Sequence, residues 1–340
     1  MNNLKTRKSI SGALLKRLQE LEPLVGNTPC VPFSLGDHPV YAKIEAYQLS
    51  GSAKIRPAFR ILREAILKGQ LHEKSVVVES TSGNFGVALA HLCGRLNLEF
   101  VPVIDPNIPA EKEAILRQLC SRVIKVREQG PGGFLITRLV RVSQFLKEEE
   151  NAYHPDQYKN PNNYLSYYDM ANEVIRQAKG IRHVFVGVSS GGCITGMSRR
   201  LKQLNPEIEI IAVDVEGSKV FGNENKSRSI SGIGSALRGD IVDLAMIDRV
   251  VVLSESQIVE GAHALARDQG VLLGASSGAV YMAAKLVLSE CEAGSAGLMV
   301  CPDDGRDYIQ SIYDEGWVAR KIGARIPRAG CRTFTIETRA

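Results

Sequence analysis

Residues 47–57, YQLSGSAKIRP, decide how the rest of this 340-residue chain is interpreted. They place one lysine, Lys54, among small and polar residues, between a predicted strand at 40–46 (VYAKIEA) and a predicted helix that starts at Pro57. Small residues let the backbone approach a bound group closely, and the first turn of a helix offers free N–H groups. Such a setting suits a reactive amine, but taken alone the stretch fits an ordinary solvated surface lysine better.

The composition narrows the class of protein. With 44% hydrophobic and 23% charged residues, the chain has ample core for two domains or for one large α/β domain. No apolar run is long enough to span a bilayer, and the basic residues 1–23 lack the apolar core of a secretory signal. We therefore expect a cytoplasmic protein that makes no membrane contact and begins with a packing helix or a flexible arm.

The charge and the cysteine and histidine content argue against nucleic-acid binding, a disulfide framework and a metal site. The net charge of +5 is spread along the chain without a basic and aromatic patch, which argues against nucleic acid and favours a small anionic substrate. Seven cysteines without a CxxC pair indicate a reducing compartment and no disulfide framework. The six histidines show no metal-ligand spacing, so we predict no metal site.

Beyond Pro57, short apolar strands alternate with amphipathic helices, a pattern that predicts parallel sheets covered by helices. One block runs to about residue 150, and a second begins with the strand HVFVGV at 183–188. Between them, YHPDQYKNPNNYLSYY at 153–168 is predicted to be a connection or a functional loop without its own element. The predicted fold class is α/β with two lobes, each a mostly parallel sheet flanked by helices, with Lys54 near their junction.

Three loops rich in glycine and hydroxyl residues follow apolar strands and open helices: 81–84 (TSGN), 189–196 (SSGGCITG) and 274–278 (GASSG). Such turns present backbone N–H groups and hydroxyls to an anion, although the first fits a plain helix N-cap equally well. The second loop is neither a nucleoside-triphosphate loop nor GxGxxG. A dinucleotide site has some support, because Asp214 and Glu216 end a later strand where a ribose-binding acid would lie.

Six motifs occur in a recognisable order: SGSAK at 50–54, TSGNFG at 81–86, QYKNPNN at 157–163, SGGCITG at 190–196, GIG at 232–234 and GASSG at 274–278. Together they resemble the pyridoxal-phosphate (PLP) enzymes of fold type II, the cysteine synthase family, over 25–317. The resemblance implies a tryptophan synthase beta-like fold and a homodimer. It also implies a larger PLP-anchoring lobe formed by 20–50 and 158–325 and a smaller substrate-binding lobe at 51–157. Residues 1–19 and 326–340 would be terminal arms.

The resemblance also implies residue roles. Lys54 would form the Schiff base with PLP and move the substrate Cα proton, Asn84 would bind the cofactor 3′ oxygen, and Ser276 would meet the pyridine nitrogen. A serine there favours β-elimination over transamination, because a hydroxyl cannot hold a proton on the ring as a carboxylate can. The cofactor phosphate would be held by Ser189, Ser190, Gly191, Gly192 and Cys193, with Thr195 nearby. The substrate carboxylate would be held by Thr81, Ser82, Gly83 and Gln157.

Several passages resemble one branch of this family, which acts in siderophore pathways and joins O-phospho-L-serine to L-glutamate on the way to 2,3-diaminopropionate. They are GGFLITRLVRV at 132–142, DQYKNPNN at 156–163, AVDVEGSKVFG at 212–222 and PDDGRDYIQSIYDEGW at 302–317. Ser189 and Tyr158 stand where cysteine synthases usually have glycine and phenylalanine, which is compatible with a polar amino-acid nucleophile. Arg138 is either a partner for the glutamate carboxylate or an exposed helix charge.

Other interpretations remain open. The same chemistry with sulfide, giving cysteine, or with another amine differs only in the nucleophile. A nucleotide-dependent oxidoreductase and a non-catalytic binding protein on this fold are the alternatives of other classes. Ile55, where the family commonly has aspartate, and Cys193, where it commonly has a hydroxyl residue, are departures that leave a diverged substrate open.

Overall fold

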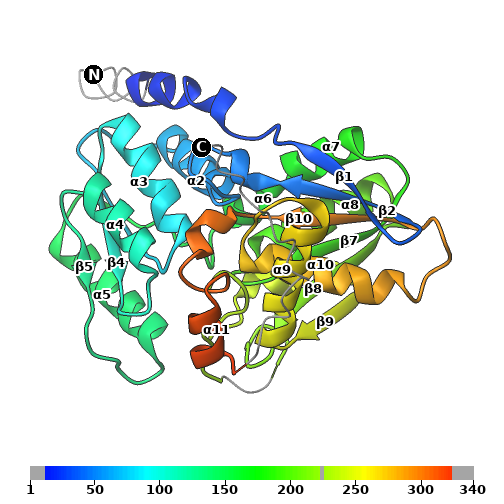
Figure 1. Ribbon diagram of the computed structural model, residues 1–340. Helices are drawn as coiled ribbons and strands as arrows, with labels where there is room; N and C mark the ends of the chain where they lie inside the picture. Colours follow the sequence, from blue (N-terminus) through cyan, green and yellow to red (C-terminus); the bar gives the residue numbers. More distant parts are fainter. Residues whose placement is uncertain (1–11, 223–225, 324–340) are drawn as a thin grey trace, which may run out of the picture.

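Two β-sheets organise the chain, and the structure, a computed structural model, describes residues 12–222 and 226–323. The larger sheet has six strands in the order β1-β2-β10-β7-β8-β9, and the smaller has four in the order β5-β4-β3-β6. In Figure 1 the smaller sheet and its helices lie at the left, and the larger sheet with its helices lies at the right. The predicted α/β fold, with two lobes that each hold a mostly parallel sheet flanked by helices, is confirmed.

All strand pairs are parallel except β1 with β2. The strands of the larger sheet are β1 (Cys30–Leu35), β2 (His38–Ile44), β7 (Ile181–Gly187), β8 (Glu209–Val215), β9 (Arg249–Leu253) and β10 (Ala296–Cys301). Those of the smaller sheet are β3 (Val76–Ser80), β4 (Glu99–Ile104), β5 (Ile124–Lys125) and β6 (Ala152–Tyr153). Every residue of β3 and β10 is buried, as expected for parallel strands that are covered on both faces.

Amphipathic helices cover both sheets. The smaller sheet is packed by α2 (Ile55–Leu67), α3 (Asn84–Leu96), α4 (Ala110–Leu119) and α5 (Phe134–Glu148). The remaining helices are α6 (Pro161–Leu165), α7 (Tyr167–Gln177), α8 (Gly192–Leu204), α9 (Glu255–Gln269), α10 (Ala275–Leu288) and α11 (Glu315–Lys321). Short 3-10 helices are η1 (Glu22–Leu24), η2 (Glu45–Tyr47), η3 (Asp240–Leu244) and η4 (Gly305–Tyr308).

The passage at 153–168 is not the loop without elements that the sequence predicted. It contains the end of β6, all of α6 and the start of α7. Asn160 caps α6 by accepting a hydrogen bond from Asn162 N at 3.0 Å, and Pro161 occupies the first helical position, where its missing N–H is not needed. The prediction was wrong because the polar, proline-containing composition of a helix start is the same as that of a loop.

One helix start differs from the prediction, and the N-terminal region follows one of the two expectations. Helix α2 begins at Ile55 and not at Pro57, because a proline in the first helical turn lacks only an N–H that would have no helical partner. Near the N-terminus, residues 12–19 form a helix, and Leu14 and Leu18 are buried in the core shared with α2 and α3. Of the two expectations for this region, the packing helix is therefore the one observed over 12–19. Residues 1–11 and 326–340 of the predicted arms lie outside the described residues, and the lobe bounds stay a prediction.

No helix within 12–222 and 226–323 is both long enough and apolar enough to cross a bilayer. The same residues contain no group of three or more His, Cys, Asp or Glu side chains that are placed to hold a metal ion.

Candidate active site

Lys54 immediately precedes α2, in a loop that is fastened to the end of β10. Ala53 N donates a hydrogen bond to Pro302 O at 2.8 Å, and Ser52 forms an isolated β-bridge with Asp303. The half-buried Lys54 side chain extends its Nζ to 3.4 Å from Ser190 Oγ. The lysine and the glycine-rich loop of 189–196, which are far apart in sequence, are therefore in contact.

Burial makes the Lys54 amine a weaker base than an ordinary lysine. Desolvation lowers the pKa of Lys54, and its interactions with Cys193 and Asp303 oppose this effect without reversing it. An amine that is less often cationic is able to act both as a nucleophile and as a base. The neighbouring Ile55 is fully buried in the apolar core of the smaller lobe, where an aspartate would lose its hydration.

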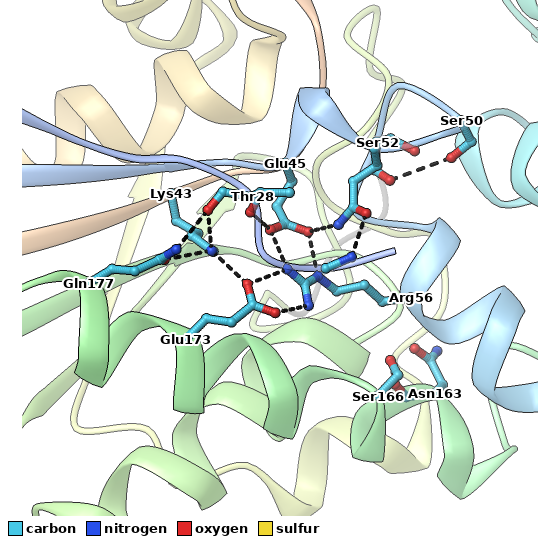
Figure 2. A network of polar contacts seen from close by, with 12 residues as sticks. Thr28, Lys43, Glu45, Ser50, Ser52, Arg56, Asn163, Ser166, Glu173 and Gln177 are labelled. Carbon is cyan, nitrogen blue, oxygen red and sulfur yellow. Dashed lines mark hydrogen bonds and ion pairs between the residues drawn. The ribbon is translucent and has the colours of Figure 1, made fainter. Parts of the chain in front are cut away.

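A buried ionic network fixes the helix that begins after Lys54 (Figure 2). The Arg56 guanidinium donates to Glu45 through Nε (2.6 Å) and Nη2 (2.8 Å), and to Glu173 through Nη1 and Nη2 (both 2.8 Å). Lys43 Nζ lies 2.6 Å from Glu173 Oε2 and donates to Thr28 O at 2.7 Å. Two cations and two anions thus hold the first turn of α2 against β2, η2 and α7, so that the backbone of Lys54 has little freedom to move.

The charges of this network stabilise one another. Burial alone would raise the pKa of Glu173, but hydrogen bonds and charge from Arg56 and Lys43 outweigh burial and lower the pKa to about 2. The carboxylates likewise raise the pKa of Arg56 despite its burial. Glu173 and Arg56 therefore remain ionised near neutral pH, whereas burial lowers the pKa of Lys43 although Glu173 and Glu45 oppose this effect.

The loop 189–196 has the geometry of an anion site at the amino end of α8. Gly191 has a φ of +89°, and an added Cβ would lie 2.4 Å from Val242 Cγ2. A Cβ on Gly192 would lie 2.1 Å from Asn163 Oδ1. Both positions therefore require glycine, and the backbone N–H groups of this helix end are suited to a phosphate.

The side chains of this loop differ in what they offer a phosphate. Ser189 is half-buried and Ser190 is buried. Burial raises the pKa of Cys193 to about 12, so its thiol is neutral. Thr195 donates its hydroxyl proton to Ile241 O at 2.8 Å.

Asn84, the first residue of α3, reaches across to the larger lobe. Its Nδ2 donates to Asp303 Oδ2 at 2.7 Å, and Tyr308 OH donates to the same oxygen at 2.8 Å. Asn84 Oδ1 and Asp303 Oδ1 are buried without a hydrogen-bond partner in the part of the chain that the structure describes. Burial raises the pKa of Asp303 although the hydrogen bonds from Tyr308 and Asn84 oppose this effect.

Ser276 lies in the first turn of α10. Its Oγ is buried and has no hydrogen-bond partner among the described residues. A Cβ on Gly187, at the end of β7, would lie 3.4 Å from Ser276 Cβ, so the helix start approaches the strand that leads into the 189–196 loop. A hydroxyl in this position is free to bond a ligand atom.

These groups fit pyridoxal phosphate. An amine of lowered pKa suits its aldehyde, and a glycine loop at a helix amino end suits its phosphate. The unpaired Oδ1 of Asn84 is able to accept from the ring hydroxyl, and the unpaired hydroxyl of Ser276 is able to donate to the ring nitrogen. The residue roles themselves remain predictions.

The residues predicted for the substrate carboxylate also come together. Thr81 is buried, and its Oγ1 accepts hydrogen bonds from Gly83 N at 3.2 Å and Gly86 N at 2.9 Å, so it shapes the turn. Ser82 in the same turn is exposed. Gln157 is buried and donates Nε2 to Ser80 O at 3.3 Å, which places it beside the same turn.

Arg138 is buried, so its interpretation as an exposed helix charge was wrong. Its Nε lies 3.1 Å from Asp105 Oδ2 without hydrogen-bond alignment, and its Nη1 has no hydrogen-bond partner in the described chain. Its charge reaches Tyr158, whose pKa is raised mainly by burial, and Tyr158 in turn bonds Ser235 of the larger lobe.

Sequence reasoning missed Arg56, Asp303 and Asn163. Arg56 and Asn163 stand inside or beside recognised motifs. The sequence alone does not show that these side chains are buried, or which groups the Arg56 charge and the Asn163 amide contact. Asp303 is one of two adjacent aspartates, and only its burial distinguishes it from Asp304. The acid proposed for a ribose, Asp214, is buried and accepts a hydrogen bond from Val215 N at 2.9 Å.

Fold and site together define a class, the α/β proteins of two lobes in which a partly buried lysine contacts a glycine-rich loop at the start of a helix. The family model for pyridoxal-phosphate dependent enzymes matches residues 21–303, and the chain belongs to that family. It is thus a PLP-dependent enzyme of the β-replacement type.

Individual relatives agree with this assignment. The chain is 36% identical over 311 residues to an N-(2-amino-2-carboxyethyl)-L-glutamate synthase of Cupriavidus metallidurans, a match that covers 88% of this chain and 91% of the relative. Among solved structures it is similar to an O-acetylserine dependent cystathionine beta-synthase of Helicobacter pylori (28% identity, TM-score 0.81, 86% and 98% covered). It is also similar to a hydrogen sulfide-producing enzyme of Fusobacterium nucleatum (26% identity, TM-score 0.79, 84% and 98% covered).

Proposed function

We propose that this enzyme replaces the phosphate of O-phospho-L-serine by the amino group of L-glutamate, giving N-(2-amino-2-carboxyethyl)-L-glutamate and phosphate. The name of the relative that is 36% identical supports this product. The main alternative uses sulfide or another amine on O-acetyl- or O-phosphoserine, and the name of one structural neighbour includes O-acetylserine as its substrate.

The observation that carries the proposal is the state of Arg138. A buried guanidinium with Asp105 as its ion-pair partner still has Nη1 unpaired, and such a donor is costly unless a ligand satisfies it. L-Glutamate carries a side-chain carboxylate that suits a guanidinium, whereas sulfide carries none. Tyr158 and Ser189 add hydroxyl groups that a polar nucleophile is able to use.

Bound PLP supplies an electron sink for the bonds at the substrate Cα. The chain's own residues orient the substrate and move its protons. The turn of Thr81 to Gly83, with Gln157, would bind the α-carboxylate through N–H and amide donors. The Lys54 amine, which burial keeps more readily neutral, would take the Cα proton while the leaving group departs from Cβ and would later return it.

The proposed product places the enzyme before a reaction that releases 2,3-diaminopropionate for a siderophore or a related natural product. We also propose a cytoplasmic homodimer, in keeping with the resemblance described above.

A product assay tests the proposal. The PLP-loaded enzyme is incubated with O-phospho- or O-acetyl-L-serine against L-glutamate, sulfide and ammonia, and products are identified by mass. We expect N-(2-amino-2-carboxyethyl)-L-glutamate from phosphoserine and L-glutamate. Formation of cysteine alone would refute the proposed nucleophile but not the reaction type.

A variant of Arg138 tests whether this residue binds the proposed nucleophile, L-glutamate. Arg138→Gln is expected to raise the KM for L-glutamate. The matched control is Arg141→Gln on the same helix, because Arg141 forms a surface pair with Glu148 at 3.1 Å. An unchanged KM for L-glutamate in Arg138→Gln would show that Arg138 does not bind the nucleophile.

A further inference from the structure

A cysteine, a histidine and a glutamate meet at the edge of the larger sheet that lies opposite the candidate active site. His183 on β7 and Glu209, the first residue of β8, are direct neighbours near the amino ends of their strands. Cys291 lies just beyond α10, the helix whose first turn carries Ser276. The 14 residues of α10 correspond to about 20 Å, so the cluster is separate from the PLP site.

The three side chains form a relay of hydrogen bonds. His183 Nδ1 lies 2.7 Å from Glu209 Oε2, and His183 Nε2 lies 3.8 Å from Cys291 Sγ. A carboxylate accepts only, so Nδ1 carries the proton and Nε2 presents a lone pair to the thiol. This order of nucleophile, base and orienting carboxylate is the arrangement that activates a thiol or hydroxyl.

Cys291 also faces open space. It lines a cavity of ≈ 370 Å³ beside the β1–β2 hairpin, together with Asp37, His38, Lys285 and Ser289. That volume is in the range of small-molecule sites. A small reagent therefore has room to reach the sulfur from this side.

The thiol needs its base. Burial and the carboxylates of Glu209 and Glu290 raise the pKa of Cys291, while Arg249 opposes them, so the thiol stays protonated near neutral pH. Transfer of the thiol proton to His183 yields the reactive thiolate despite this raised pKa, because Glu209 stabilises the imidazolium that forms. None of the other cysteines in the described ranges hydrogen-bonds to an imidazole.

We propose that Cys291 is a thiol-modification site that reacts with small disulfides, with His183 as its base and Glu209 as the group that orients the base. The Cys291 S–H proton passes to His183 Nε2, and Sγ attacks one sulfur of the disulfide RS–SR. The S–S bond of the reagent breaks as the Cys291–SR bond forms, and the leaving thiolate takes the proton from His183. The reagent is the oxidant, and the protein thiol is oxidised to a mixed disulfide.

The experiment follows the modification of each cysteine in the PLP-loaded enzyme. Hydroxyethyl disulfide, a small neutral probe, is added in excess, and peptides are quantified by mass after acid quenching. Among the cysteines in the described ranges we expect Cys291 to react first, ahead of the half-buried Cys30, for which no imidazole partner is found there. His183→Asn is expected to slow the reaction at Cys291 about tenfold or more.

Two further variants keep the proposal open to refutation. His38→Asn changes a histidine that lines the same cavity but bonds Ser295 O, and it is expected to leave the rate unchanged. Glu209→Gln is a second, separate test, and it is expected to slow the reaction at Cys291 less than His183→Asn does.

The competing explanation is purely structural. In it Cys291 only donates its thiol to Val287 O at 3.3 Å, and His183 is a bystander. It predicts that Cys291 reacts no faster than Cys30, or that both His183→Asn and Glu209→Gln keep the wild-type rate. Either result would overturn the proposal, and thermal unfolding of each variant checks that its fold is intact.

Discussion

Replacing Glu173 by glutamine is expected to destabilise the protein strongly, although the side chain keeps its size. Glu173 neutralises Arg56 and Lys43 in a network from which water is excluded, with contacts of 2.6 to 2.8 Å. The variant would leave two buried cations with only Glu45 as their counterion, and its amide N–H group would face donors. Leaving a buried charge uncompensated in this way costs about 3–5 kcal/mol.

The pKa of Glu173 leads to a similar magnitude. It is lowered from 4.5 to about 2 on folding. Since each pKa unit corresponds to about 1.4 kcal/mol, the ionised carboxylate stabilises the fold by about 3 kcal/mol. Because the folded pKa is the lower one, this contribution is complete above pH 4.5 and is lost as the pH falls through about 2.

Urea unfolding of wild type and Glu173→Gln at pH 7, followed by circular dichroism, measures the difference in the free energy of unfolding. Repetition between pH 4.5 and 2 is expected to show the difference shrinking. The control is Glu290→Gln, since Glu290 pairs with Arg249 at 2.7 Å on the surface and is 61% exposed. The free energy of unfolding of Glu290→Gln is expected to fall by less than about 1 kcal/mol. If Glu173→Gln costs no more than this control, the network does not stabilise α2 as described.

Three further predictions concern the cofactor site. Lys54→Ala is expected to abolish turnover and the visible absorbance of the lysine-bound cofactor, and a variant that keeps both would refute the role of Lys54. Gly192→Ala is expected to weaken PLP binding at least about tenfold in a spectrophotometric titration, because its Cβ would lie 2.1 Å from a side-chain oxygen of α6. Gly94→Ala, a helical glycine with open space around it, should bind PLP normally, and equal affinities of the two variants would contradict the steric argument. Tyr308→Phe removes a 2.8 Å hydrogen bond to the buried Asp303 and is expected to cost about 1–3 kcal/mol in thermal or urea unfolding, whereas no loss would mean that the carboxyl group finds another donor.

The apolar strands and the punctuating glycines were sufficient to predict the lobes and most of their elements, because both signals are local. The prediction was wrong at 153–168, where a capping asparagine and a proline at the first helical position look like loop residues. Helix α7 escaped notice because its polar face is as prominent in the sequence as its buried face, which includes Tyr167, Met170 and Val174.

The sequence by itself determined which reactive and binding residue types the loops carry and in which order they occur. The order of six motifs around Lys54 indicated the family, since turn geometry and residue type at each loop are written locally in the chain. Only the tertiary structure decided which charges are buried and which partners they find. Arg56 and Glu173 are 117 residues apart, Asn84 and Asp303 are 219 apart, and His183 and Cys291 are 108 apart. Parallel sheets bring such distant residues together, and burial then sets their pKa values and the strength of their bonds.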